Sequence, residues 1–300
     1  MESIDHLLSE FFINKSSQTS KSYRSDLENF RRYLNLKNIN DTIAHVIYAP
    51  HSQANLIVLH YKVEMLKTGT KPGTINRRLS TIRSLVRLAY NTGLIPWRLD
   101  ITNEPLSPNR LVEGDGEQIF QKVLKAAKNQ KSTLKARRDT AIVRLLHDLA
   151  LKRHSITALD LSDLNVSRRK LAVEIPGTKE RVVKKLPLTT IKCLKNWLEI
   201  RGIKKGPLFV NFDHAGKGQR LTGSSIYRIV KQLGTECGIK ASPQMIRNAA
   251  IQKALKIANI EGIESTQLIQ FSNHRNPASL RRFQSKSMDI QSAISKLLSD

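Results

Sequence analysis

Residues 97–115, WRLDITNEPLSPNRLVEGD, divide the sequence into two parts with different patterns. This segment contains two prolines and a polar run, and it has neither helical nor strand periodicity. A chain of 300 residues is long enough for two domains that each bury a core. We therefore predict a linker at 101–115 between an N-terminal domain, 1–100, and a C-terminal domain, 116–300.

The first hundred residues have only helical patterns. Apolar side chains recur at helical spacing in the segments 20–36, 53–66 and 71–90. The last segment, KPGTINRRLSTIRSLVRLAY, starts with a predicted turn at Pro72-Gly73, and Thr74 is the expected N-cap. One side of this helix is apolar, and arginines occupy the rest. These arginines are Arg77, Arg78, Arg83 and Arg87.

The second part contains the signal of a β-hairpin. KLAVEI (170–175) alternates in polarity, PGTKE is a turn sequence, and RVVKKLPL (181–188) is the returning strand. The rest of this part has helical patterns, so the predicted fold class is mainly α with a small β-sheet. The helices are expected at 116–128, 136–151, 189–201, 223–237, 243–259, 265–271 and 277–283.

The charge of the chain indicates a polyanionic partner. Fifty Lys and Arg residues against 25 Asp and Glu give a net charge of +25 and a sequence pI near 10.3. Such an excess of positive charges destabilises the fold through mutual repulsion. When these charges neutralise the phosphates of a nucleic acid, counterions are released and binding is favoured. Nucleic acid is the predicted partner, and a membrane-surface or ribosome-associated protein is the alternative.

Other features indicate an intracellular protein without a metal or cofactor. No signal peptide and no apolar run long enough to span a membrane are present, so the predicted location is cytoplasmic, on the nucleoid if the source is prokaryotic. Cys193 and Cys237 lie far apart, without the spacing of metal ligands, and are expected to be free thiols.

Several segments, in their order along the chain, resemble the motifs of the tyrosine recombinases, the phage integrase family. LLHDLALKRHSITALDLSDL (145–164) resembles the first catalytic motif, and the hairpin that follows resembles the lysine-bearing hairpin of the family. SPQMIRNAA (242–250) and FSNHRNPASLRRF (271–283) resemble the last two motifs, and 71–96 resembles the end of the N-terminal domain. The resemblance implies a helical core-binding domain and an α+β catalytic-type domain that clamp double-stranded DNA.

The resemblance also implies a chemistry. Members of the family attack the scissile phosphate with a tyrosine, and two arginines stabilise the charge that develops on the phosphate. A hairpin lysine protonates the leaving oxygen, and histidines transfer protons or bind the phosphate. No metal or cofactor is needed, because the covalent link to the tyrosine conserves the bond energy.

At two of the functional positions of the motifs this sequence has the residue of the family, and at three it has another residue. Arg247 takes the place of the second arginine, and His274 that of the last histidine. Lys152 replaces the first arginine and loses its bidentate fork. Gln244 replaces a histidine and cannot shuttle a proton, and Phe283 stands in the place of the nucleophile without its hydroxyl.

The remaining site positions leave alternatives open. Lys179 is the candidate hairpin acid, although the usual lysine position holds Pro176, and a solvated turn lysine is the other interpretation. Asn248 replaces a second histidine that is frequent in the family. His147 and His154, beside Lys152, are expected to be structural or exposed. The basic runs 168–170 and 184–185 are interpreted either as solvated strand ends or as contacts with the DNA backbone.

No shift in register restores a nucleophile, because no tyrosine follows Tyr227. Tyr227 is expected to pack within a helix, and Ser279 or Ser285 would need a general base that only His274 offers. We therefore predict a recombinase homologue that binds DNA without cutting it, as an accessory, architectural or regulatory factor. The alternative is an active recombinase with altered chemistry, or one completed in trans by a partner's tyrosine.

Two sets of contacts complete the prediction. The amphipathic segment MDIQSAISKLLSD (288–300) is expected to dock onto a second copy or a tyrosine-bearing recombinase, unless it packs on its own domain. Contacts with DNA phosphates are expected from one set of basic side chains. These are Arg77, Arg78, Arg83, Arg87, Lys152, Arg247 and His274.

Overall fold

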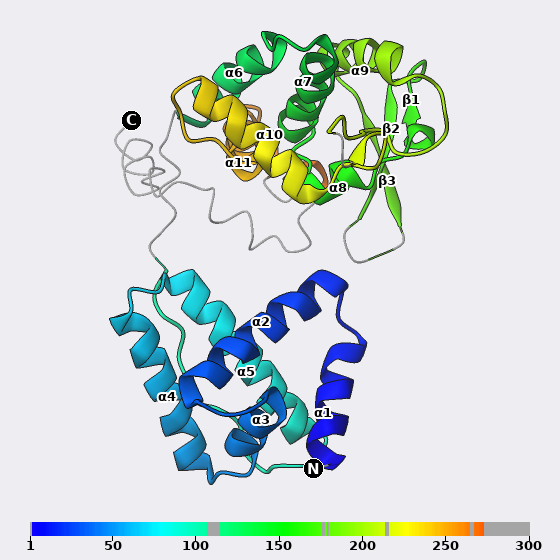
Figure 1. Cartoon of the computed structure of the whole chain (residues 1–300). Helices are drawn as coiled ribbons and strands as arrows, with labels where there is room; N and C mark the ends of the chain where they lie inside the picture. Colours follow the sequence, from blue (N-terminus) through cyan, green and yellow to red (C-terminus); the bar gives the residue numbers. More distant parts are fainter. Residues whose placement is uncertain are drawn as a thin grey trace, which may run out of the picture. The chain divides into compact units, whose positions relative to one another are not determined.

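The computed structural model of this chain describes residues 2–106, 115–175, 178, 180–213, 216–264 and 267–272. The chain forms two compact units, Met1–Asn109 and Arg110–Asp300 (Figure 1). The first unit is helical, and the second combines helices with a three-stranded sheet. The predicted fold class, mainly α with a small β-sheet, is confirmed.

The first unit is built around its fifth helix, which packs against the first, second and fourth. Leu27, Phe30, Val58 and Leu79 are completely buried between these helices. The helices at residues 2–13 and 39–47 were not predicted. The five helices are α1 (Glu2–Ile13), α2 (Ser17–Leu34), α3 (Ile39–Ile47), α4 (His51–Lys67) and α5 (Pro72–Asn91).

The start of α5 differs from the prediction. Lys71 is the N-cap and Pro72 is the first helical residue, so Thr74 lies inside the helix and is not its cap. The reason is that proline has the helical φ already and lacks only an N–H that has no partner in the first turn.

The second unit is arranged around α7 (Thr133–Asp148), which contacts α6, α9 and α11. Ile142, Leu145 and Trp197 are buried in its core. The other helices are α6 (Asp115–Lys128), α8 (Arg153–Thr157), α9 (Leu188–Arg201), α10 (Gly223–Glu236), α11 (Pro243–Ile260) and α12 (Leu268–Ser272), with a 3₁₀ turn at Leu161–Asp163.

The predicted hairpin is present. β2 (Lys170–Glu174) pairs antiparallel with β3 (Arg181–Lys185), and β1 (Leu164–Asn165), which was not predicted, pairs with the other edge of β2. The register places Leu171 opposite Lys184. Leu171 and Val173 turn the inner face of the sheet towards the core of this unit.

The end of α7 corrects the predicted helix 136–151. The helix stops at Asp148, and Ala150 has a φ of 47°, which an α-helix cannot continue. Lys152 is therefore not on α7 but is the N-cap of α8. Arg153 follows it as the first residue of α8.

Several predicted features lie outside the described residues: Lys179, His274, Phe283, the serines 279 and 285, and the segments 277–283 and 288–300. No helix in the described part of the chain is long and apolar enough to span a membrane. The same part contains no group of three or more His, Cys, Asp and Glu side chains that could bind a metal ion.

Candidate phosphate-binding site

Arg247 is the centre of the candidate site. Ser242 caps α11 by accepting a hydrogen bond from the Met245 amide at 3.3 Å, and Pro243 is the first helical residue, as predicted. One turn further on, the Arg247 side chain is 1% exposed. Its guanidinium donates to the carbonyl of Ala150 and, at 2.6 Å, to the carbonyl of Ser272. Arg247 thus joins the turn after α7 to the end of α12.

A small apolar cluster supports this junction. Ala150 packs with the buried face of α11, and side chains of α12 cover the cluster from the other side. Its members are Ala150, Ala250, Ile251 and Leu255, with Leu268, Ile269 and Phe271 against them. The packing explains why the left-handed turn at Ala150 and the short α12 lie beside Arg247.

Lys184 belongs to the site, although the sequence analysis left it as a solvated strand end or a backbone contact. Its side chain is buried, with 9% exposed, whereas the neighbouring Lys185 is exposed. The Lys184 Nζ donates to the carbonyls of Gln270 and Phe271 at 2.8 and 3.1 Å. Burial, together with the charge of Arg247, lowers the pKa of Lys184 to about 8.

Lys152 and His154 lie at the start of α8, next to the Ala150 turn. Lys152 is half-buried, and His154 is exposed. Partial burial and the charges of Lys152, Arg247 and Arg153 lower the pKa of His154, while Glu174 acts in the opposite direction. His154 is therefore within electrostatic reach of both Lys152 and Arg247. We call Lys152, His154, Lys184 and Arg247 the cation cluster.

An amide pair occupies the positions at which the motif places histidines. The Gln244 Nε2 donates to the Asn248 Oδ1 at 2.6 Å, one turn along α11. Gln244 is exposed and Asn248 is half-buried. Amides form hydrogen bonds with a phosphate oxygen but do not transfer protons near neutral pH.

A buried network holds the end of α7 in place below the cluster. His147 stacks on Phe120 and bonds to Asp148 at 2.8 Å and Glu117 at 3.1 Å, so its role is structural. Asp148 also accepts a bond from the Thr190 hydroxyl at 2.6 Å. Burial opposes ionisation of Asp148, but the bonds from His147 and Thr190 and the charge of Arg144 together lower its pKa.

The arrangement suits an oxyanion. The cations of the cluster are Lys152, Lys184 and Arg247. They create a positive potential, which the carboxylate of Glu174 reduces and partial burial strengthens. None of the residues in the cation cluster or the amide pair has a hydroxyl or thiol that could act as a nucleophile. Tyr227 lies on α10, as predicted, with 41% of the residue exposed, so it is not part of the buried core. The buried face of α10 passes through Ile226, Val230 and Leu233 instead.

The arginines predicted to contact DNA have different surroundings in the first unit. Arg77 pairs with the buried carboxylate of Asp26, and Arg78 donates to Asn29 at 3.1 Å. Arg83 donates to the carbonyl of Ile101 at 2.7 Å, whereas Arg87 is exposed. Three of the four therefore stabilise their own unit, and their DNA contacts stay a prediction.

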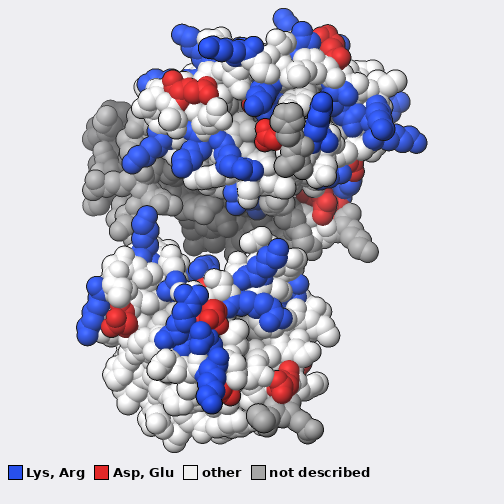
Figure 2. Space-filling view, in the orientation of Figure 1, with Lys and Arg blue, Asp and Glu red and all other residues white. Residues whose placement is uncertain are grey.

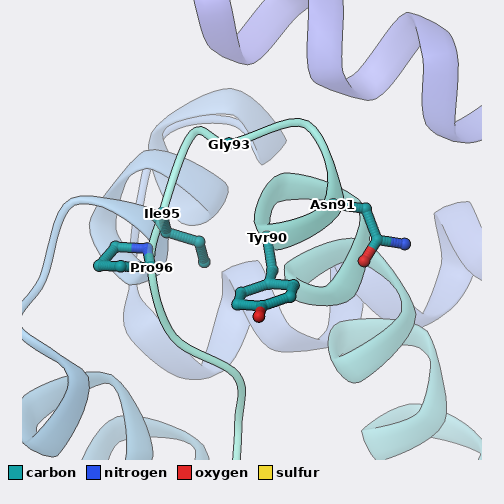
Figure 3. A pocket seen from close by; sticks show the side chains of 5 residues that line it. All are labelled: Tyr90, Asn91, Gly93, Ile95 and Pro96. Carbon is teal, nitrogen blue, oxygen red and sulfur yellow. The ribbon is translucent and has the colours of Figure 1, made fainter.

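Basic side chains are spread over the visible face of each unit, with acidic ones between them (Figure 2). A hollow of about 650 Å³ lies at the end of α5 (Figure 3). Its lining residues are Tyr90, Asn91, Gly93, Ile95 and Pro96, and none of them carries a charge. The hollow therefore lacks the groups that an oxyanion site requires.

Comparisons with known proteins agree with the motifs. The model of the phage integrase family matches residues 116–289. A tyrosine recombinase of Synechocystis sp. is 30% identical over 304 residues, which cover 98% of this chain and 95% of that protein. One of Synechococcus elongatus is 29% identical and covers 93% of this chain and 88% of that protein.

Solved structures share the fold. The integrase of transposon Tn1549, in complex with transposon right-end DNA, has a TM-score of 0.69 at 15% identity and covers 99% of this chain and 98% of that one. A lambda integrase dimer bound to a core site has a TM-score of 0.68 at 13% identity, with 96% of each chain covered.

Proposed function

Because this chain belongs to the phage integrase family, the family of the tyrosine recombinases, we propose that it binds double-stranded DNA as a recombinase homologue that does not cleave the strand. Its role is that of an accessory, architectural or regulatory factor at a DNA site. Lys152 and Arg247 bind a backbone phosphate, and the two units each contribute further backbone contacts.

One observation carries this proposal. The last tyrosine of the sequence is Tyr227, and Phe283 stands where the motif places the nucleophile. Phenylalanine keeps the ring and lacks the oxygen that would form the phosphotyrosyl bond. The charges of Lys152 and Arg247 attract a phosphate without any need for that oxygen.

Binding is supported by charge and by fold. A net charge of +25 gains free energy from counterion release on a polyphosphate. The Tn1549 and lambda integrases, which share the fold, were solved on DNA. Lys152 in place of an arginine retains a phosphate contact as a point charge and gives up the bidentate grip on a transition state.

A second role has support from the amphipathic segment 288–300. It carries Ile290, Ile294, Leu297 and Leu298 on one side, a pattern that suits docking onto another recombinase. A tyrosine-bearing partner would supply the nucleophile in trans, which a second copy of this chain cannot do. Strand exchange that needs both proteins, and neither alone, would favour this role.

The binding proposal is tested by selecting fragments of genomic DNA on the purified chain and footprinting the bound site. On that site, Lys152→Gln is compared with Arg153→Gln, its neighbour on α8. We expect Lys152→Gln to weaken binding and to reduce the slope of log Kd against log salt by about one phosphate contact. Arg153→Gln should change binding less. Absence of any selected site, at any salt concentration, would contradict DNA binding.

A further inference from the structure

Strand β3 buries a lysine and exposes its valines. Val182 and Val183 are 39% and 58% exposed, whereas Lys184 is 9% exposed. A strand normally turns its apolar residues inwards, and an ammonium in the interior lowers stability unless a specific interaction requires it there. Lys184 lies on the inner face of the hairpin, opposite Leu171. A lysine at this buried position therefore indicates that its positive charge or its N–H donors are needed there.

The Lys184 ammonium contacts the end of α12. Its Nζ donates to the carbonyls of Gln270 and Phe271, and the Arg247 guanidinium donates to the next carbonyl, that of Ser272. Three consecutive carbonyls in the last turn of one short helix therefore bind to two buried cations. We call Lys184 and Arg247, with these three carbonyls, the carbonyl clamp.

The clamp places two positive charges at the carbonyl end of α12. The last carbonyls of a helix have no partner within it, and they carry the negative end of the helix dipole. Lys or Arg in the last turn commonly binds them, but LIQFS has no basic residue. Lys184 and Arg247 supply positive charge to this end of the helix from β3 and α11.

We propose that Lys184 is a positioning residue: with Arg247 it holds the last turn of α12, and thereby the point from which the chain continues towards His274. Lys184 acts through α12 and does not itself contact DNA. Among the described residues, the ionisable group that acts on it is Arg247, since α12 and Leu171 have none and Lys185 turns to the opposite face. Burial and this guanidinium lower the pKa of Lys184 to about 8, as expected for an ammonium that has no carboxylate partner in the described part of the chain.

The experiment is amide hydrogen exchange of the full chain, followed in peptides that span 267–272. We expect Lys184→Met to raise exchange in this region at least tenfold, and Lys184→Arg, which keeps the charge and the donors, to restore protection. Lys185→Met, the same change at the exposed neighbour, is the matched control and should leave α12 unchanged. Protection of α7 and α9 in the same spectra shows whether each variant is folded.

Unchanged exchange at 267–272 in a folded Lys184→Met variant would overturn the proposal. If this variant does not fold, the comparison passes to Lys184→Arg against Lys184→Gln, and equal exchange in these two would overturn it as well. The proposal would also be overturned if Lys184→Arg lost as much protection as Lys184→Met, because the positive charge would then not be what protects α12.

A second measurement separates positioning from direct contact, and it rests on the proposed function. On the selected DNA site, Lys184→Met should weaken binding several-fold with an unchanged salt slope, and Lys184→Arg should restore the affinity. A slope reduced by about one would make Lys184 a phosphate ligand and contradict the positioning role. If the chain binds no DNA, the proposed function fails, while the exchange result still decides the role of Lys184.

Discussion

Lys184 couples the candidate site to pH at the scale of a single residue. In the folded chain its pKa is about 8, whereas an exposed lysine keeps its ordinary value of 10.5. Below pH 8 both states hold the proton, and the folded state bears the cost of the buried charge. Between about 8 and 10.5 the unfolded chain binds more protons, so the free energy of unfolding rises with pH.

We therefore expect the wild-type chain to gain stability across this pH window from Lys184, by an amount that approaches roughly 3 kcal/mol if the burial is not relieved by local opening. Urea unfolding of the second unit, followed from pH 7 to pH 10.5, measures the gain. Lys184→Met, which cannot titrate, should show a flatter profile. Identical slopes in the two proteins would mean that the Lys184 ammonium is solvated in the folded state.

Asp148 links stability to pH through a carboxylate instead of an ammonium, and its contribution is lost at low pH. Its folded-state pKa is lowered, so it contributes stability above the pKa of an unfolded Asp, about 3.9, and loses this contribution as the pH falls through the acid range. Asp148→Asn should lower the free energy of unfolding at pH 7 by about 1–3 kcal/mol, because His147 and Thr190 lose their charged partner.

The difference between Asp148→Asn and the wild type should shrink as the pH falls below about 4, because the unfolded state takes up the proton first and the folded state only at its lower pKa. Asp213→Asn, at an exposed position in the same unit, is the control and should change little at either pH. A difference that stays constant down to pH 3 would assign the effect to packing instead of charge.

At the scale of elements, α5 shows how one basic helix divides its arginines between two tasks. Arg77 compensates the buried carboxylate of Asp26, which Thr81 also binds at 2.9 Å. Arg87 is exposed on the same helix. The first arginine belongs to the stability of the unit, and the second is available to a partner.

The two arginines should consequently respond differently to the same change. Arg77→Gln should destabilise the first unit by about 1–3 kcal/mol, because it leaves the Asp26 carboxylate without its charged partner. Arg87→Gln should leave the melting temperature unchanged and reduce the salt slope of DNA binding by about one. Calorimetry and a salt titration measure the two effects, and equal melting temperatures for both variants would refute the division.

Some elements could be predicted from the sequence and others could not. The hairpin and α5 were predictable because alternation and helical spacing are local patterns. The end of α7 was not, since the left-handed Ala150 depends on packing against α11 and α12. Lys184 was missed for a related reason: RVVKK does not reveal that its fourth residue meets carbonyls 86 and 87 positions away. The motif predicted Arg247, but only the fold shows what it binds.

At the scale of the whole molecule, the groups that suit DNA binding differ from those that strand cleavage would need. A basic surface on each unit and the cation cluster suit a protein that holds DNA. The groups that would transfer protons and form the covalent bond are replaced, in the sequence, by Gln244 and Phe283. Lys152 likewise keeps a charge without the arginine fork. Restoring the phenolic oxygen alone, in Phe283→Tyr, is therefore expected to leave cleavage well below that of a tyrosine-bearing relative.

The most direct measurement uses a nicked suicide DNA that carries the selected site, on which any cleavage traps the protein as a covalent adduct. The purified chain should bind this DNA and give no adduct on a denaturing gel, while a tyrosine recombinase on its own suicide site gives one. Phe283→Tyr should give at most a trace. A covalent adduct formed by the unmodified chain alone would contradict the account.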